Sequence, residues 1–493
     1  MQRAWRSVAL VFLVPFGVAS CVVLDLFPSA DDGAGGAGAG GSGSSFAATD
    51  GSASSTVDGS AVSASSSSGV TGVTVDWVEG LNTGTPAIAS ARFLDLTLTP
   101  DAVVAAGYVI AEADYDLDFG TGCVQTMSAT TSFFAAGFDP DLGHCLWLQL
   151  LPDQSAVAAA PHASVALYDD RVHVAISDRA NMATTIHRFT PGNANEEALA
   201  ETFGLVIADI VGTPSGLAIG GYVTDGVGDC GWFEANAGET DAFFARLTGP
   251  GCGMIARVDL GHDPLEGNEE VVSVAFENGA DTITVVTDHT LTAGMMSVPV
   301  AGKSGSTFFQ DLASHDVYAS GDVTCADMSV RAPPRVAMAA GRRWVFGPNC
   351  DPHLMFLRGG ARETWELMES FPQPDFFDRP VAAAATDRLV FGGEYRGGEM
   401  PWVAQWTTGV IGSFDPNGDL RYRLDVRGED ADHDTEVTGV ATTATGETIW
   451  AIGNYATDGF TLGDFTYQAT TGYSCSPGVP CKPFITRLTV ANP

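Results

Sequence analysis

The chain has 493 residues, and only 17% of them are charged, yet its formal net charge is −37. Because so acidic a surface repels phosphate backbones, the composition argues against nucleic acid as a partner. Gly, Ala, Thr and Val are abundant, and the only two lysines are Lys303 and Lys482, so short β-strands are expected rather than long charged helices.

The first 20 residues have the layout of a signal peptide. Arg3 and Arg6 precede an apolar run from Val8 to Val18. A helix of that length is too short to span the ~30 Å hydrocarbon core of a bilayer. Small residues then lead up to Cys21, as before a cleavage site. We therefore expect residues 1–20 to be an export signal.

The stretch Val18-Ala19-Ser20-Cys21 resembles the lipobox of bacterial lipoproteins. In that family the cysteine thiol receives a diacylglycerol and the peptide is cut before the cysteine. The resemblance implies lipidation at Cys21 and anchoring in a membrane. An aspartate after the cysteine retains such proteins at the inner membrane, whereas Val22 follows here, which implies the outer membrane. An ordinary signal peptide with a chance cysteine is the alternative.

Residues 21–72 are expected to form the lipidated N-terminus and a disordered linker. From Ser29 onward the segment consists mainly of Gly, Ser and Ala with scattered Asp, and it cannot bury enough apolar surface to order itself. A flexible chain of this length has an end-to-end reach of roughly 35–40 Å. The linker would therefore hold a folded domain clear of the lipid headgroups.

Residues 73–493 contain a degenerate repeat of short strands. One recurring unit is an apolar strand that ends in Gly and Tyr, as in Val103–Val109 and Leu217–Val223. A second unit, such as Ser132–Asp141, follows after a loop of variable length and ends in a tight turn before another strand. With the apolar run that precedes each Gly-Tyr strand, this gives four strands per repeat. The repeats begin near Phe93, Ser164, Leu205, Val271, Arg335, Val381 and Val437.

Four-stranded antiparallel units repeated in this way are typical of a β-propeller, so the sequence predicts an all-β, seven-bladed propeller. The last repeat supplies three strands, and Val73–Gly80 resembles the missing fourth. An N-terminal strand that closes the last blade would leave no open edge. The pattern resembles the propeller repeat of exported bacterial proteins and of myxobacterial lipoproteins, which implies a protein of the cell envelope.

Eight cysteines follow Cys21, and they fall into neighbouring pairs. Cys123 and Cys230 lie in the loop after a Gly-Tyr strand, while Cys145 and Cys252 lie in the turn after the next strand. Equivalent positions in two repeats predict the disulfides Cys123–Cys145 and Cys230–Cys252. The remaining predicted pairs are Cys475–Cys481 and Cys325–Cys350. Zinc binding is the competing interpretation, and the absence of a CxxC motif disfavours it.

Two groups of acidic residues are candidates for ion binding. Asp114, Asp116 and Asp118 alternate as at the start of a calcium loop, but Gln125 stands where a bidentate glutamate is expected. The alternative is a strand with acids on its exposed face. No cofactor other than this calcium is expected.

A second group lies in acidic loops between repeats, where loops leading to innermost strands would line one mouth of the channel. Its members are His262, Asp263, His433 and Asp434. Acids and imidazoles gathered there would suit a divalent ion or a cationic ligand, and solvated loops are the alternative. Nearby, Asn417-Gly418 predicts a type I′ hairpin turn.

The sequence favours a binding protein over an enzyme. No HExxH, GxSxG or Cys/His nucleophile pattern occurs. We expect a monomeric module, held at the membrane by its lipid, that binds a protein or glycan ligand. The alternatives are a polysaccharide lyase or glycoside hydrolase with its site in the central funnel, and a purely structural envelope component.

Overall fold

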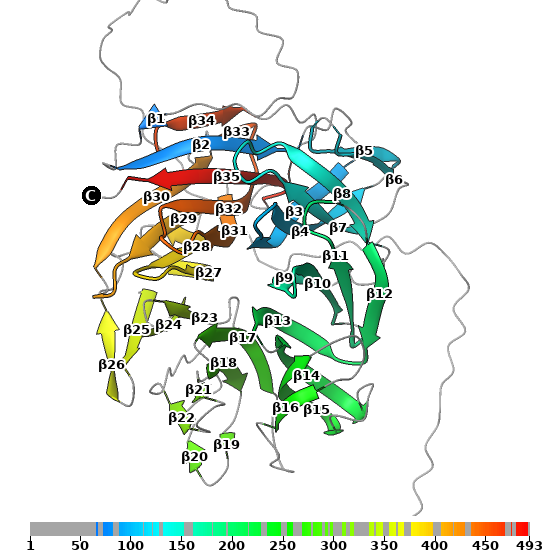
Figure 1. The fold of residues 1–493 in the computed structure, drawn as a ribbon, viewed down its shortest axis with the longest axis vertical. Coiled ribbons are helices and arrows are strands. Elements are labelled where there is room, and N and C mark those ends of the chain that lie inside the picture. Colours follow the sequence, from blue (N-terminus) through cyan, green and yellow to red (C-terminus); the bar gives the residue numbers. More distant parts are fainter. Residues whose placement is uncertain are drawn as a thin grey trace, which may run out of the picture. The chain divides into compact units, whose positions relative to one another are not determined.

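The computed structural model describes residues 66–67, 72–81, 88–111, 113–120, 122–127, 132–151, 161–179, 181–193, 196–214, 216–227, 234–247, 254–259, 269–277, 280–287, 291–293, 296–298, 308–311, 316–319, 335–339, 342–348, 354–360, 363–368, 376–397, 406–417, 419–428, 435–468, 475 and 480–491. Within these ranges every regular element is a β-strand, and neighbouring strands pair antiparallel (Figure 1). The described part of the chain is therefore all-β, as predicted.

Seven sheets of four to six strands contain most of the described strands. Sheet 1 contains β3 (Ile88–Leu98), β4 (Val103–Ala111), β7 (Ser132–Phe138) and β8 (Cys145–Leu151). Sheet 2 contains β9 (His162–Tyr168), β10 (Arg171–Asp178), β11 (Ala183–Phe189) and β12 (Glu196–Phe203). Sheet 3 contains β13 (Val206–Thr213), β14 (Gly216–Val227), β15 (Glu234–Leu247) and β16 (Met254–Asp259). Sheet 4 contains β17 (Glu269–Glu277), β18 (Ala280–Thr287), β21 (Phe308–Asp311) and β22 (Asp316–Ala319).

The last three sheets follow the same order, and two of them gain extra strands. Sheet 5 contains β23 (Arg335–Ala339), β24 (Arg342–Pro348), β25 (Leu354–Gly360) and β26 (Glu363–Met368). Sheet 6 contains β27 (Phe376–Ala384), β28 (Leu389–Gly397), β29 (Trp406–Phe414), β30 (Leu420–Gly428), β33 (Gly459–Leu462) and β34 (Phe465–Gln468). Sheet 7 contains β31 (Thr435–Thr442), β32 (Thr448–Tyr455), β35 (Lys482–Val490), β2 (Val73–Gly80) and β1 (Ser66–Ser67). Two hairpins stand apart, β5 (Tyr115–Asp118) with β6 (Val124–Met127) and β19 (Leu291–Ala293) with β20 (Met296–Val298).

The first strands of successive sheets contact one another in chain order. β3 contacts β9, β9 contacts β13, β13 contacts β17, and the series continues through β23 and β27 to β31, which in turn contacts β3. Four-stranded antiparallel meanders packed in this order are the architecture of a β-propeller. The predicted fold class is confirmed, while the number of blades stays a prediction.

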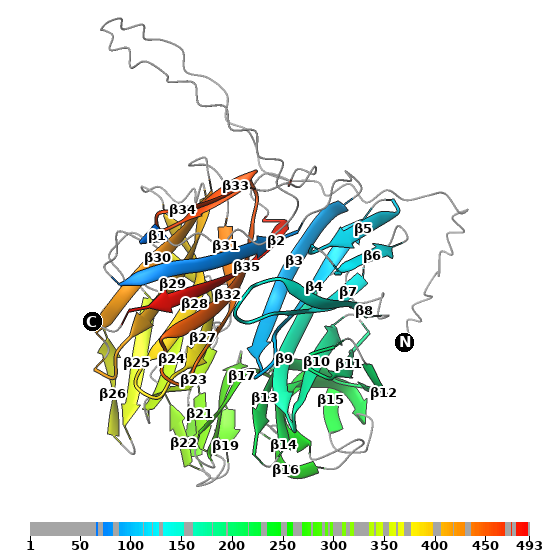
Figure 2. The ribbon, with the colours of Figure 1, turned by 45° about the horizontal axis from the view of Figure 1, so that its top comes forward.

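The N-terminal strand β2 completes sheet 7, which is otherwise built from the C-terminal part of the chain. Figures 1 and 2 show β2 beside β35, and the two strands pair antiparallel from Val73↔Val490 to Gly80↔Phe484. The predicted pairing of the two ends of the domain is confirmed. The short strand β1 pairs in turn with Thr74 and Val75, so part of the range assigned to the linker extends this sheet.

The glycine of the repeated Gly-Tyr unit is explained by close packing. In sheet 1 a side chain on Gly107 would meet the carbonyl oxygen of Arg92 and the ring of Phe134. In sheet 7 a side chain on Gly453 would meet the carbonyl oxygen of Glu436 and the ring of Phe484. In both sheets the carbonyl belongs to the first strand, just before a β-bulge in its pairing with the second strand. Only glycine leaves room for this approach.

Side chains of neighbouring sheets satisfy backbone groups of the first strands. The amide of Val165 in sheet 2 donates to Asp95 Oδ2 of sheet 1 (2.7 Å). The amide of Val274 in sheet 4 donates to Asp209 Oδ2 of sheet 3 (2.8 Å). Edge amides that would otherwise be unpaired are thereby bonded across sheet boundaries, which links the sheets to one another.

The predicted type I′ turn at Asn417-Gly418 is wrong. β29 ends at Phe414 and β30 begins at Leu420, so the connection has five residues. The amide of Asp415 donates to the carbonyl of Asp419 (3.0 Å), and the amides of Asn417 and Asp419 donate to Asp415 Oδ1. The aspartate side chain organises a longer turn in place of the two-residue loop, because it supplies the acceptor for these amides.

Candidate functional site

Several predicted site residues lie outside the residues that the structure describes. They are Cys21, the cysteines of the predicted pairs Cys230–Cys252 and Cys325–Cys350, and the channel-mouth residues His262, Asp263, His433 and Asp434. Lipidation, those two disulfides and the channel-mouth site stay predictions.

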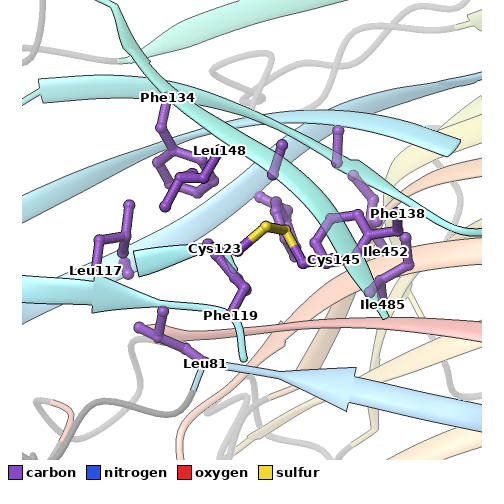
Figure 3. Close-up of a cluster of buried hydrophobic side chains, with 14 of the residues drawn as sticks. Leu81, Leu117, Phe119, Cys123, Phe134, Phe138, Cys145, Leu148, Ile452 and Ile485 are labelled. Atoms are coloured by element: carbon purple, nitrogen blue, oxygen red, sulfur yellow. A yellow bond between two sulfur atoms is a disulfide. The ribbon is translucent and has the colours of Figure 1, made fainter. Parts of the chain in front are cut away.

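The two predicted disulfides that fall in the described ranges are present. Cys123 is bonded to Cys145, and Cys475 is bonded to Cys481. The first joins the turn of the β5–β6 hairpin to the start of β8. Figure 3 shows it among Phe119, Phe138 and other apolar side chains of one buried cluster. That cluster also includes Ile452 and Ile485 of sheet 7, so the hairpin is part of the core between sheets 1 and 7.

The three aspartates of the calcium candidate lie at the β5–β6 hairpin. Tyr115 and Leu117 point into the core, whereas Asp114 and Asp116 are exposed. Asp116 Oδ1 accepts from the Thr126 hydroxyl (2.6 Å), and Asp118 Oδ1 accepts from an amide two residues on. In the described part of the chain, no group of three or more His, Cys, Asp or Glu side chains could hold a metal ion. The alternation matches a strand with one buried and one exposed face, and calcium binding by these aspartates stays a prediction.

A buried polar group spans the boundary between sheets 1 and 7. Arg92 on β3 forms an ion pair with Glu436 on β31, whose side chain is 1% exposed. Asn454 Nδ2 donates to Glu436 Oε1 (2.7 Å) and to the carbonyl of Phe93 (3.1 Å), and Asn454 Oδ1 accepts from the amide of Phe93 (2.8 Å). Burial acts to lower the pKa of Arg92, but Glu436 and Tyr108 raise it above its ordinary value. The guanidinium therefore stays charged.

The turn between β7 and β8 adds a second link between the same sheets. Trp450 Nε1 donates to the carbonyl of Pro140 (3.0 Å), and Arg487 donates to the carbonyl of Asp141 (3.2 Å). The ring of Trp77 on β2 lies against Gly143, whose φ of +78° favours glycine. The turn of sheet 1 is therefore held by strands β2, β32 and β35 of sheet 7.

The β33–β34 hairpin links sheet 7 to sheet 6. It lies in the connection between β32 and β35, yet β33 pairs with the end of β30, from Val426↔Leu462 to Gly428↔Phe460. The ring of Phe460 packs on that of Phe484 at 4.5 Å between centroids. At the start of β35 the buried Lys482 donates to the carbonyl of Thr457 (2.8 Å). Sheet 7 is therefore hydrogen-bonded to sheet 1 on one side and to sheet 6 on the other.

We call the end of sheet 7 at which the chain enters β2 the linker end. It is marked by the pair Val73↔Val490 and by the amide of Val490, which donates to the carbonyl of Glu447 (2.7 Å). The amide of Thr386 in sheet 6 donates to the carbonyl of Ala444 (2.8 Å), so the turn after β27 lies at the same end.

The turns that join third and fourth strands in sheets 1 and 6 also lie at the linker end. In sheet 6, β28 starts where β29 stops, at the pair Leu389↔Phe414, which places residues 415–419 there. In sheet 1, the amide of Ala91 donates to the carbonyl of Cys481, which lies near the end of sheet 7 opposite to the linker end. Strand β3 runs from there towards the linker end. The strand pairing then places the turn at 139–144 at the linker end.

Sequence reasoning missed the Arg92–Glu436 pair. An arginine and a glutamate on edge strands are expected to be solvated. No sequence pattern indicates that two positions 344 residues apart are in contact. One signal was available, because Asn454 stands where Tyr108 and Tyr222 follow the glycine in sheets 1 and 3. That departure from the repeat marks the contact with Phe93.

Comparisons with known proteins assign neither a family nor an activity to this chain. No protein-family model matches the chain, and no curated protein matches it. The β-propeller domain of the Trilobed protease from Pyrococcus furiosus is similar over 78% of this chain and 96% of that one, with 8% identity and a TM-score of 0.41. The WD40 domain of SCAP from fission yeast is similar over 83% and 97%, with 9% identity and a TM-score of 0.35. The hemagglutinin-neuraminidase ectodomain of parainfluenza virus 5 is similar over 85% of each chain, with 10% identity and a TM-score of 0.36.

No helix long and apolar enough to cross a membrane occurs in the described residues.

Proposed function

We propose that this chain is an outer-membrane lipoprotein whose β-propeller is a monomeric, non-catalytic binding module for a protein or glycan ligand. The observation that supports it most directly is the junction described above. The chain that follows Cys21 enters sheet 7 through β1 and β2, and β2 is paired with β35 from Val73 to Gly80. In a domain that is tethered by its N-terminus, the first long strand must stay paired when the tether is pulled. The contacts of sheet 7 with sheets 1 and 6 stabilise this strand.

The architecture also suits recognition by loops. Buried antiparallel sheets fix the ends of each connecting segment, so the connections can vary in length and sequence without disturbing the core. The connections in sheets 1 and 7 are the clearest cases, because their hairpins β5–β6 and β33–β34 are held by the core between sheets 1 and 7 and by pairing with β30, respectively. A platform of packed sheets that fixes the ends of variable connections is a common basis for ligand binding.

The anchor is tested by metabolic labelling of the expressing cells with radioactive palmitate. The native chain should be labelled and should fractionate with the outer membrane, whereas Cys21→Ala should be unlabelled. Ser29→Ala in the linker is the matched control and should behave as the native chain. Equal labelling of the native and Cys21→Ala chains would refute the lipid anchor.

The ligand class is tested with the full-length Cys21→Ala chain on a glycan array and in a pull-down against envelope proteins. Retention of a defined glycan or protein at stoichiometric amounts supports a binding module. Cleavage of array glycans, seen as loss of the immobilised sugar, would instead favour the polysaccharide-active enzyme.

A further inference from the structure

Large exposed apolar side chains are rare in the described part of the chain, and two of the three lie at the linker end. Leu142 is 63% exposed in the turn between β7 and β8, and Leu420 is 46% exposed directly after the turn between β29 and β30. The third, Val124, is 52% exposed on β6. The two leucines belong to sheets 1 and 6, whose first strands both contact β31 of sheet 7. They therefore lie on either side of the point where the linker enters.

The turn that contains Leu142 and the turn that precedes Leu420 are each organised by an aspartate side chain that accepts hydrogen bonds from amides of its own turn. Asp139 Oδ1 accepts from the amides of Asp141 (2.9 Å) and Leu142 (2.8 Å). In sheet 6, Asp415 Oδ1 accepts from two amides of its own turn, the second belonging to Asp419 (3.0 Å). Side-chain acceptors of this kind fix the turn conformation, so each leucine is held outward at little cost in conformational entropy on contact.

Arginines partner three carboxylates at the linker end, in a protein whose net charge is −37. The closest nitrogen–oxygen distances are 3.2 Å for Asp141–Arg487, 3.0 Å for Asp387–Arg388 and 2.7 Å for Asp415–Arg421. The side chain of Arg421 is 53% exposed and directly follows Leu420. An exposed apolar side chain beside an exposed cation suits the boundary between acyl chains and phosphates.

We propose that the linker end of sheets 1, 6 and 7 rests on the bilayer that holds the lipid anchor, with Leu142 and Leu420 in the headgroup region and Arg421 at the phosphates. This inference depends on the proposed anchor at Cys21. Two leucines offer too little apolar surface to hold a free protein at a membrane. The linker is long enough to hold the domain clear of the headgroups, but because it is flexible it also lets the domain approach them. It makes the contact intramolecular, at an effective concentration on the order of mM, so a weak contact suffices. The opposite end of the sheets then faces away from the membrane.

The test measures the membrane depth of single positions in the full lipidated chain. An environment-sensitive fluorescent amino acid replaces Leu142, Leu420 or, as the control, the exposed Asp114, which follows the end of β4 that lies away from the linker end. Each protein is reconstituted in vesicles of phosphatidylethanolamine and phosphatidylglycerol that contain brominated acyl chains. We expect quenching at positions 142 and 420 to exceed that at position 114 at least threefold, and Leu420→Ser to reduce the quenching at 142. Equal quenching at the three positions would overturn the proposal.

Flotation of the same vesicles separates the two possible failures. If the native chain floats, Cys21→Ala does not, and the three positions are quenched alike, the anchor stands and the membrane-facing surface is refuted. If the native chain does not float, both proposals fall. The fluorophore at positions 142 and 420 could also report a less polar environment without vesicles, to an extent that rises with protein concentration. That result would show a contact between two copies of the chain, which also overturns the proposal.

Discussion

Replacing Glu436 by alanine should be among the most destabilising single changes in the described part of the chain. The carboxylate is 1% exposed and accepts hydrogen bonds from Arg92 and Asn454. Its removal leaves the guanidinium of Arg92, whose side chain is only 15% exposed, without its counter-ion between two sheets. Breaking a buried ion pair from one side costs about 3–5 kcal/mol. Because Arg92 keeps some contact with solvent, we expect about 3 kcal/mol.

The physical reason is the unpaired charge, so removing both charges should be milder than removing one. The double variant Arg92→Met/Glu436→Leu replaces the pair with apolar side chains of similar length, and such replacements are often neutral. The exchange Asp387→Ala is a control, because Asp387 is 59% exposed in its pair with Arg388 and an exposed pair contributes at most about 1 kcal/mol.

Urea titrations followed by tryptophan fluorescence measure these differences as changes in the free energy of unfolding. We expect the order of stability to be native, then Asp387→Ala, then the double variant, with Glu436→Ala least stable. A loss below about 1 kcal/mol for Glu436→Ala, or a double variant that is less stable than Glu436→Ala, would refute the argument that a stranded charge between sheets 1 and 7 determines the cost.

Three further variants test other parts of the structure. Burial alone would raise the pKa of Asp425, but its arginine neighbours on β30 lower it, so its contribution to stability is present at neutral pH and declines as the pH falls below about 4. Asp425→Asn should therefore lose more stability at pH 7 than at pH 3, and an equal loss at both would contradict this. Gly453→Ala should lower the free energy of unfolding by about 1–3 kcal/mol, because a Cβ there meets a carbonyl and the ring of Phe484, and unchanged urea midpoints would show that the strands can separate. Replacing both Cys123 and Cys145 by serine should cost about 3 kcal/mol, since the disulfide closes a loop of 22 residues, and a smaller loss in urea would mean that the apolar cluster alone orders the hairpin.

The repeat predicted the strand order and the N-terminal strand of sheet 7 because strand formation depends on local alternation of apolar residues and on turn residues. The same register placed Cys123 and Cys145 together, since equivalent positions in a repeat occupy equivalent places in space. Val73–Gly80 could be assigned because the last repeat lacked a fourth strand and an unpaired edge is unfavourable.

Contacts between sheets were not predictable from the same signals. From the sequence, the β33–β34 hairpin is expected to be a loop of its own repeat, yet it pairs with β30 of the preceding sheet. Nothing in the hairpin's sequence indicates this pairing partner. The turn at 415–419 was misjudged because Asn417-Gly418 is a strong local signal, whereas the acceptor that decides the turn is the side chain of Asp415. Side-chain hydrogen bonds of this kind override dipeptide preferences.

The residue after the repeated glycine shows how such contacts can nevertheless be read from a sequence. Sheets 1 and 3 have tyrosine there, whereas sheet 7 has Asn454, which bonds both the amide and the carbonyl of Phe93. A phenol has one oxygen and cannot offer a donor and an acceptor in the fixed geometry of an amide. The asparagine is needed where the last sheet meets the first strand of sheet 1. In a degenerate repeat, a polar residue that replaces an apolar or aromatic one at a fixed position therefore indicates a contact outside the repeat.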